Sequence, residues 1–183
     1  MKIYTIIAGV NGVGKSSLSG VLKSTRADLG CIIDPDRIAA QNSNNALAGK
    51  IAVKKIRQLL SDGVSFTQET TLSGGFIKKT VKAAHENGYF IRLFYIGLNS
   101  SEESVKRIKN RVQKGGHNIP SSDVLRRFSK RFADLKAVLV YCQEGYFYDN
   151  ENGFLQVGEY RNGEFIPTTT EIPEWYNELQ GYF

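Results

Sequence analysis

The sequence contains little cysteine and little proline. Its two cysteines, Cys31 and Cys142, are too few and too far apart for a disulfide framework or a spaced metal site, which indicates a reducing cytoplasm. Only four prolines occur in 183 residues, and no Pro-rich or Ser-rich run marks a linker. We therefore expect one α/β domain over residues 1–183, without an internal boundary.

Long apolar runs are also absent. The first ten residues, MKIYTIIAGV, resemble the start of a signal peptide, but they lead into Gly12-Val13-Gly14-Lys15 without a small-residue cleavage site. No stretch reaches the roughly 18 apolar residues that a membrane span needs. We expect a cytoplasmic protein with no membrane partner.

The charge balance favours anionic partners, with a net charge of +6 and a pI near 9.3. Basic residues become denser between Lys106 and Lys136. Nucleic-acid binding would call for aromatic side chains interleaved with these charges, and that pattern is missing. A small phosphorylated ligand is therefore favoured over a nucleic acid.

Apolar runs alternate with segments of helical spacing. Strands are predicted over residues 3–8, 31–33, 64–68 and 89–98, and helices over residues 15–28, 37–40, 46–61, 75–87, 102–114 and 121–141, with a polar loop at 42–45. This alternation implies a parallel sheet with right-handed crossovers. Asn162-Gly163 predicts a C-terminal hairpin of residues 154–160 and 164–166, followed by a short helix that holds Trp175 and Tyr176.

The stretch GVNGVGKS satisfies the phosphate-loop pattern G-x-x-x-x-G-K-S between a predicted strand and a predicted helix. Lys15 would reach the β- and γ-phosphates of ATP, and Ser16 would ligate Mg²⁺. The sequence lacks an Asn-Lys-x-Asp guanine reader and an aspartate at the end of strand 89–98, which disfavours switches and motors. The predicted nucleotide-binding residues are Gly9, Asn11, Gly12, Val13, Gly14, Lys15, Ser16 and Ser17.

Acidic residues follow the second predicted strand. Asp34 and Asp36 flank Pro35, and ligands collect at the carboxyl ends of parallel strands. One of the two carboxylates can accept a proton from a substrate hydroxyl, as a kinase requires, or hold a water of Mg²⁺. The alternative is that either residue only caps the helix of residues 37–40.

A second polar group, Glu69-Thr70-Thr71, is expected to follow the next strand and to reach the same crevice as substrate contacts. The alternative is a helix cap at residues 71–73. The adjoining letters Leu72-Ser73-Gly74-Gly75 match part of a transporter-ATPase signature. They stand too close to the phosphate loop for that role, so we interpret them as a turn that leads into a helix.

Arginines surround a Gly115-Gly116 turn, and a helical lid is predicted over residues 102–135. Arginines on a lid can neutralise the charge of a transferred phosphoryl group, although a solvated helix face is the alternative. Arg111 and Arg127 are favoured over Arg126, and His117 is expected to be a turn residue. The core stripe of the second lid helix is predicted as Val124, Leu125, Phe128, Phe132 and Leu135, with Arg127 and Arg131 beside it.

Four segments together, AGVNGVGKSSL, IIDPDRIA, SFTQETTLSGG and RVQKGGHNIP, resemble the zeta-toxin-like P-loop kinases, in the short branch often labelled predicted ABC-type ATPases. The resemblance covers residues 3–150. It implies a P-loop NTPase three-layer sandwich related to nucleotide kinases, with ATP and Mg²⁺. By the same resemblance Lys15 is the phosphate-loop lysine, Asp36 the general base and Glu69 a sugar contact, while Arg111 and either Arg127 or Arg131 act from the lid.

The better-known zeta toxins phosphorylate a hydroxyl of UDP-N-acetylglucosamine and are neutralised by an antitoxin. The resemblance therefore implies a small, nucleotide-linked phosphate acceptor and a protein antitoxin as partner. The predicted acceptor contacts are Glu69, together with Asp34 and Thr71 from their place at the carboxyl ends of strands. Residues 148–150 are expected near the nucleotide base. This chain departs from the family in its GGHNIP turn and in Lys130, which leaves the acceptor open. Two alternatives remain, an ATP-binding protein that acts through a protein partner and, ranked last, a polynucleotide kinase.

Overall fold

The computed structural model describes residues 1–40, 45–116 and 118–183. Most of the loop predicted at residues 42–45, and the turn role predicted for His117, lie outside the described residues. Asn45 itself begins a helix, not the end of a loop.

The described residues form a seven-stranded sheet in the order β2-β3-β1-β4-β5-β6-β7. The strands are β1 (Ile3–Ala8), β2 (Cys31–Ile33), β3 (Phe66–Thr70), β4 (Phe90–Gly97), β5 (Glu144–Asp149), β6 (Leu155–Arg161) and β7 (Glu164–Pro167). The first five in the sheet order are parallel to one another, and β6 and β7 are antiparallel. The predicted α/β class, with a central parallel sheet, is confirmed.

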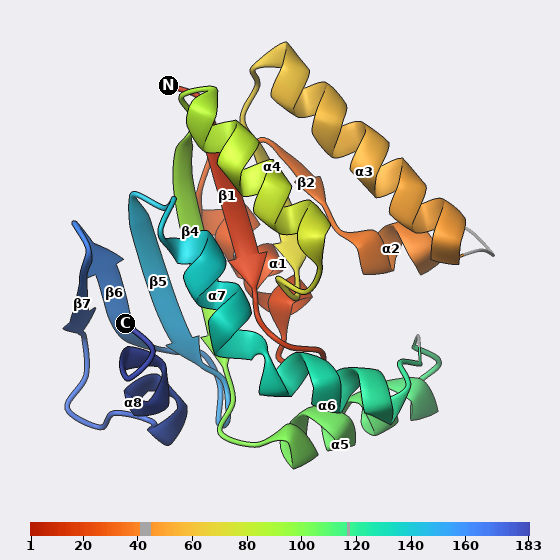
Figure 1. Cartoon of the computed structure of the whole chain (residues 1–183). Coiled ribbons are helices and arrows are strands. Elements are labelled where there is room, and N and C mark those ends of the chain that lie inside the picture. The colour runs from red at the N-terminus through yellow and green to blue at the C-terminus, as the bar shows by residue number, and fades with distance from the viewer. Residues whose placement is uncertain (41–44, 117) are drawn as a thin grey trace.

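Helices cover both faces of the sheet. They are α1 (Lys15–Thr25), α2 (Pro35–Ala40), α3 (Asn45–Asp62), α4 (Gly75–Glu86), α5 (Ser101–Gln113), α6 (Ser121–Ser129), α7 (Arg131–Leu139) and α8 (Glu174–Gln180). Helix α1 lies behind the sheet in Figure 1, whereas α3, α4 and α7 lie in front of it. The three layers predicted from the sequence are therefore present.

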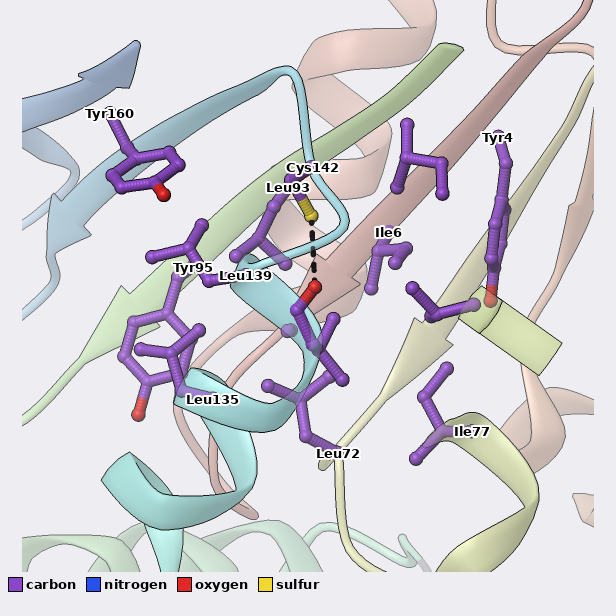
Figure 2. Close-up of a cluster of buried hydrophobic side chains, with 14 of the residues drawn as sticks. Tyr4, Ile6, Leu72, Ile77, Leu93, Tyr95, Leu135, Leu139, Cys142 and Tyr160 are labelled. Carbon is purple, nitrogen blue, oxygen red and sulfur yellow. Dashed lines mark hydrogen bonds between the residues drawn. The ribbon is translucent and has the colours of Figure 1, made fainter. Parts of the chain in front are cut away.

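Two apolar cores form because successive side chains of a strand point to opposite faces. In β1, Tyr4 and Ile6 belong to the core under α3, α4, α7 and α8, whereas Ile7 belongs to the core under α1. Figure 2 shows the first of these cores, where Leu72 and Ile77 pack among the side chains of the central strands.

The C-terminal part of the chain contains the predicted hairpin. Asn162 and Gly163 have φ angles of 53° and 88° between β6 and β7, as a type I′ turn requires. The final helix, α8, buries Trp175 and Tyr176 against the sheet.

Several boundaries differ from the prediction. Helix α1 ends at Thr25, because Arg26 adopts an extended backbone conformation and pairs with Asp28 at 3.0 Å. Strand β3 runs two residues later than expected, and β5 was missed. The segment of β5 includes Glu144, Gly145 and Asp149 and is only partly buried, so its apolar pattern is weak.

The helix predicted over residues 121–141 is two helices that meet at Lys130, whose φ and ψ are −99° and 0°. Leu125, predicted in the core stripe, is 48% exposed, whereas Val124 and Phe132 are buried. Helices α5 and α6 fall within the range predicted as a lid. They lie across the end of the sheet toward which the parallel strands point (Figure 1).

Among the described residues, no helix is both long enough and apolar enough to span a membrane.

Candidate active site

The glycine-rich loop between β1 and α1 has a backbone that only glycine tolerates at key points. Gly9 has a φ of 144°, and a Cβ there would lie 2.4 Å from the carbonyl oxygen of Ile96 on β4. Gly14 has a φ of 98° and stands directly before α1. No acidic residue occupies the first turn of α1, so the positive end of the helix is free to attract phosphate.

Lys15 folds back onto this loop. Its ammonium group donates hydrogen bonds to the carbonyl oxygens of Gly9 and Val10, both at 3.0 Å. Burial lowers the pKa of Lys15, while the carboxylates of Asp36 and Glu69 oppose that shift. A phosphate anion beside Lys15 would supply the strong charge partner that two neutral carbonyls do not.

A cavity of about 520 Å³ opens at the carboxyl ends of the parallel strands. It brings together most of the predicted site residues, namely Asn11, Gly12, Gly14, Lys15, Ser16, Ser17, Asp34, Asp36, Glu69, Thr71, Arg111 and Arg127. Gly9 and Val13 do not line it. They shape the loop from behind, where Val13 is fully buried.

Three oxygen-bearing side chains meet beside the phosphate loop. The Ser16 hydroxyl donates to Oε2 of Glu69 at 2.9 Å and lies 3.4 Å from Oδ2 of Asp34. Glu69 is only 4% exposed. Burial, followed by the charge of Asp34, raises its pKa, and the hydroxyls of Ser16 and Ser19 partly offset this.

This oxygen cluster fits the donor set of Mg²⁺, which protein sites hold through one or two carboxylates together with phosphate oxygens and water. Among the described residues, no group of three or more His, Cys, Asp and Glu side chains could hold a metal by itself. In Mg²⁺ sites of this kind, phosphate oxygens and water complete the coordination of the cation.

Asp34 and Asp36 have different positions. Oδ1 of Asp34 accepts the backbone N–H groups of Asp36 and Arg37, so Asp34 caps α2 as one sequence alternative held. Its other oxygen faces Ser16. Asp36 does not cap the helix: its side chain is 53% exposed and lies 3.6 Å from the guanidinium of Arg111 on α5.

Two arginines of the predicted lid, Arg127 and Arg131, contact different parts of the molecule. Arg127 on α6 reaches the phosphate loop, where it donates to Oδ1 of the buried Asn11 at 2.9 Å. Arg131 does not line the cavity. Its guanidinium pairs with Glu178 of α8 at 2.5 Å and lies against the rings of Phe128 and Phe132. Its position does not support the predicted action on a phosphate.

Glu69 and Thr70 were expected to follow the strand, but both belong to β3. Beyond it, the hydroxyl of Thr70 accepts the backbone N–H of Leu72, which is buried and has a φ of 61°. Gly74 then caps α4 with a φ of 97°. The interpretation of residues 72–75 as a turn that leads into a helix is confirmed.

Two polar residues of the cavity wall were missed by sequence reasoning, Arg107 and Gln68. Arg107 lies one helical turn before Arg111, so its place on the same face of α5 could have been inferred from the spacing. Its guanidinium donates to Glu103 at 2.8 Å and to the carbonyl oxygen of Glu151 at 3.3 Å. No comparable spacing in the sequence marked Gln68 as a residue of the cavity wall.

The loop after β5 also packs against the phosphate loop. The side-chain amide of Asn150 donates to the carbonyl oxygen of Val13 at 2.9 Å. A Cβ at Gly14 would lie 2.6 Å from that amide nitrogen and 3.3 Å from the ring of Phe154. Residues 150 and 154 therefore pack against the phosphate loop next to Gly14.

A parallel sheet in this order, with a glycine-rich loop after its central strand and a cavity at its carboxyl edge, defines a P-loop kinase fold. The family model described as Zeta toxin matches residues 1–152. The chain belongs to the Zeta toxin family.

One sequence relative is an uncharacterized protein of Haemophilus influenzae, 37% identical over 126 residues that cover 66% of this chain and 88% of the relative. A chain in the crystal structure of AvrRxo1-ORF1:-ORF2 with ATP has a TM-score of 0.70 at 18% identity, and the match covers 98% of this chain but 63% of that one. The PezAT toxin-antitoxin system of Streptococcus pneumoniae gives a TM-score of 0.63 at 18% identity, with coverages of 100% and 84%. These two solved structures share the fold.

Proposed function

We propose that this protein transfers the γ-phosphoryl group of ATP to a hydroxyl of a small, nucleotide-linked metabolite. The observation that carries the proposal is that Lys15, Asp36, Arg111 and Arg127 line one cavity. A phosphate-loop lysine, a carboxylate and arginines are the parts that phosphoryl transfer needs, because the reaction depends on positioning and charge stabilisation.

Asp36 accepts the proton of the acceptor hydroxyl. That oxygen forms a bond to the γ-phosphorus, the bond from the γ-phosphorus to the β,γ-bridging oxygen breaks, and ADP leaves with the electron pair. The exposed carboxylate of Asp36 and its place at the cavity support this role. Its ion pair with Arg111 must open, and the γ-phosphate supplies Arg111 with a replacement partner.

Lys15 binds the β- and γ-phosphate oxygens, and Arg111 and Arg127 stabilise charge on the transferred group. Ser16 would hold Mg²⁺, with Asp34 and Glu69 nearby to accept hydrogen bonds from its water ligands or to ligate it. When bound, Mg²⁺ neutralises phosphate charge. We assign Thr71 and Glu69 to the acceptor side of the cavity. We assign residues 148–150, of which Asn150 contacts the phosphate loop, to the neighbourhood of the base.

The proposal extends to the setting of the reaction. We place it in the cytoplasm, in keeping with the free thiols of Cys31 and Cys142. We treat residues 1–183 as one domain whose segment 102–135 closes over the cavity. A protein antitoxin is a candidate partner, because the solved PezAT relative is a toxin-antitoxin system.

The test is incubation of the purified protein with ATP labelled in the γ-phosphate, Mg²⁺ and a cell metabolite extract, with UDP-N-acetylglucosamine as the first pure acceptor. Label in a phosphorylated metabolite is the expected result. Slow ATP loss without any phosphorylated product would contradict the proposal and favour an ATP-binding protein that acts through a partner. Label on nucleic-acid ends would favour a polynucleotide kinase instead.

A further inference from the structure

Gln68 is almost completely buried and yet forms part of the cavity wall. It is 5% exposed and lies on β3 between Thr67 and Glu69. Glu69 points toward Ser16 on α1, so Gln68 points to the opposite face of the sheet, toward the core that contains Tyr4. A long polar side chain at such a position needs hydrogen-bond partners at both ends of its amide.

Tyr4 satisfies one end of that amide. Its ring is fully buried and stacks on Phe66 with 4.4 Å between the ring centroids, and it is drawn in Figure 2 beside Ile6 and Ile77. Burial raises the pKa of Tyr4, so the phenol stays neutral and keeps its proton. Its hydroxyl donates to Oε1 of Gln68 at 2.5 Å.

This contact fixes which way the amide of Gln68 faces. If the amide were turned over, the Tyr4 hydroxyl would have no acceptor among the described residues, which would leave a buried donor without a partner. The Nε2 group of Gln68 is therefore held away from Tyr4. In the described part of the chain, Nε2 makes no hydrogen bond.

The surrounding wall is rich in hydrogen-bond donors and in charged groups of both signs. The Thr70 oxygen already accepts the N–H of Leu72, so its own proton is free to donate. Three carboxylates, those of Asp34, Asp36 and Glu69, line the same cavity. A ligand amine would oppose donor with donor at Gln68. The cations of the same cavity, Lys15, Arg107, Arg111 and Arg127, suit phosphate oxygens, whereas the neutral amide of Gln68 suits a neutral oxygen.

We propose that Gln68 determines acceptor specificity by donating hydrogen bonds from Nε2 to a neutral oxygen of the acceptor, such as a carbonyl, close to the hydroxyl that is phosphorylated. Tyr4 is its positioning residue. The inference rests on the proposed phosphotransfer and adds the chemistry of the group that is recognised. A site built to hydrogen-bond a substrate oxygen discriminates strongly, because an analogue without that oxygen leaves buried polar groups unpaired.

The experiment measures label transfer from ATP into a metabolite extract at serial dilutions of the extract, which gives a half-saturating acceptor concentration before the acceptor is identified. Gln68→Met removes both N–H donors at similar size. It should raise that concentration about 10- to 100-fold, while the KM for ATP changes less than about twofold. Tyr4→Phe frees the amide to rotate and should give a smaller rise.

Two further variants separate recognition from folding. Tyr4→Phe/Gln68→Met removes both hydrogen-bonding partners, so no buried group is left unpaired, and should show the acceptor defect of Gln68→Met. Thr67→Val removes a neighbouring buried hydroxyl that bonds to the carbonyl oxygen of Leu29 outside the cavity, and should leave both constants unchanged.

A wild-type half-saturating concentration in Gln68→Met and the double variant would overturn the inference, as would an equal rise in the acceptor and ATP constants. Both results leave the proposed function standing, because the wild-type protein still transfers label. Failure of the wild-type protein to label any metabolite would overturn the proposed function itself, and this inference with it.

Discussion

The two ends of the cavity are built differently. The phosphate end is built mainly from one short segment, residues 11–17, in which Val13 alone does not line the cavity. The acceptor end is assembled from separate elements: Asp36 on α2, Gln68 on β3, Arg111 on α5 and Arg127 on α6. Local sequence therefore fixes the shape of the first end, whereas the second exists only when distant elements pack together.

The largest effect is expected at the phosphate end. Lys15→Ala removes the ammonium group that lies inside the loop and should lower kcat/KM for phosphotransfer by about 10³-fold, because a phosphate-loop lysine contacts the β- and γ-phosphates directly. Transfer of labelled phosphate measures the loss. Lys23→Ala, an exposed change on the same helix, is the matched control and should stay within twofold. Equal losses in the two variants would contradict the assignment.

At the acceptor end, Asp36→Asn keeps the size of the side chain and removes its ability to take a proton. The turnover number should fall by about 10²- to 10³-fold with little change in the KM for ATP. Steady-state kinetics at saturating ATP separates the two constants. A variant with full phosphotransfer on the true acceptor would exclude Asp36 as the base.

Variants of Arg127 and Arg131 test which lid arginines belong to the acceptor end of the cavity. Arg127→Ala removes a side chain that contacts the phosphate loop through Asn11 and should lower kcat by about 10²-fold. Arg131→Ala should leave kcat within twofold and lower the melting temperature by about 4 °C, because its contacts to Glu178 and two rings are structural.

Turnover and thermal unfolding, measured on both variants, distinguish these effects. An equal loss of turnover in Arg131→Ala and Arg127→Ala would show that Arg131 also acts in the site. The acceptor end would then extend from α6 into α7.

The smallest effect is one of pH on the ligand-free protein. The pKa of Glu69 is raised from its ordinary value of 4.5. Between pH 4.5 and the raised pKa, the folded state therefore binds more protons than the unfolded state. The contribution of Glu69 to stability is present below pH 4.5 and is lost as pH rises through the raised pKa.

Urea unfolding over this pH range should therefore give a free energy of unfolding that falls more steeply in the wild-type protein than in Glu69→Gln. Identical pH profiles would show that Glu69 titrates normally. Addition of Mg²⁺ and ATP should remove much of the difference, because a bound cation favours the ionised carboxylate.

The sequence predicted the phosphate end of the cavity better than the acceptor end. The phosphate loop and the C-terminal hairpin follow from local rules, since Gly9, Gly14 and Gly163 stand where positive φ angles are required. The parallel sheet follows from the alternation of strands and helices, although β5 was missed.

At the acceptor end the predictions were less complete. Periodicity continued one helix through Lys130, so it could not separate Arg127, which turns toward Asn11, from Arg131, which turns toward α8. Gln68 was missed because its importance depends on Tyr4, a residue on another strand. Such contacts between distant segments have no local sequence pattern.

The most direct test of the central claim follows the γ-phosphate by ³¹P NMR while the wild-type protein acts on ATP, Mg²⁺ and a metabolite extract. The account predicts a new phosphate-ester signal that grows as the γ-phosphate signal of ATP declines, absent with Lys15→Ala and strongly slowed with Asp36→Asn. A rise of inorganic phosphate alone, or an ester that forms equally fast with Asp36→Asn, would contradict it.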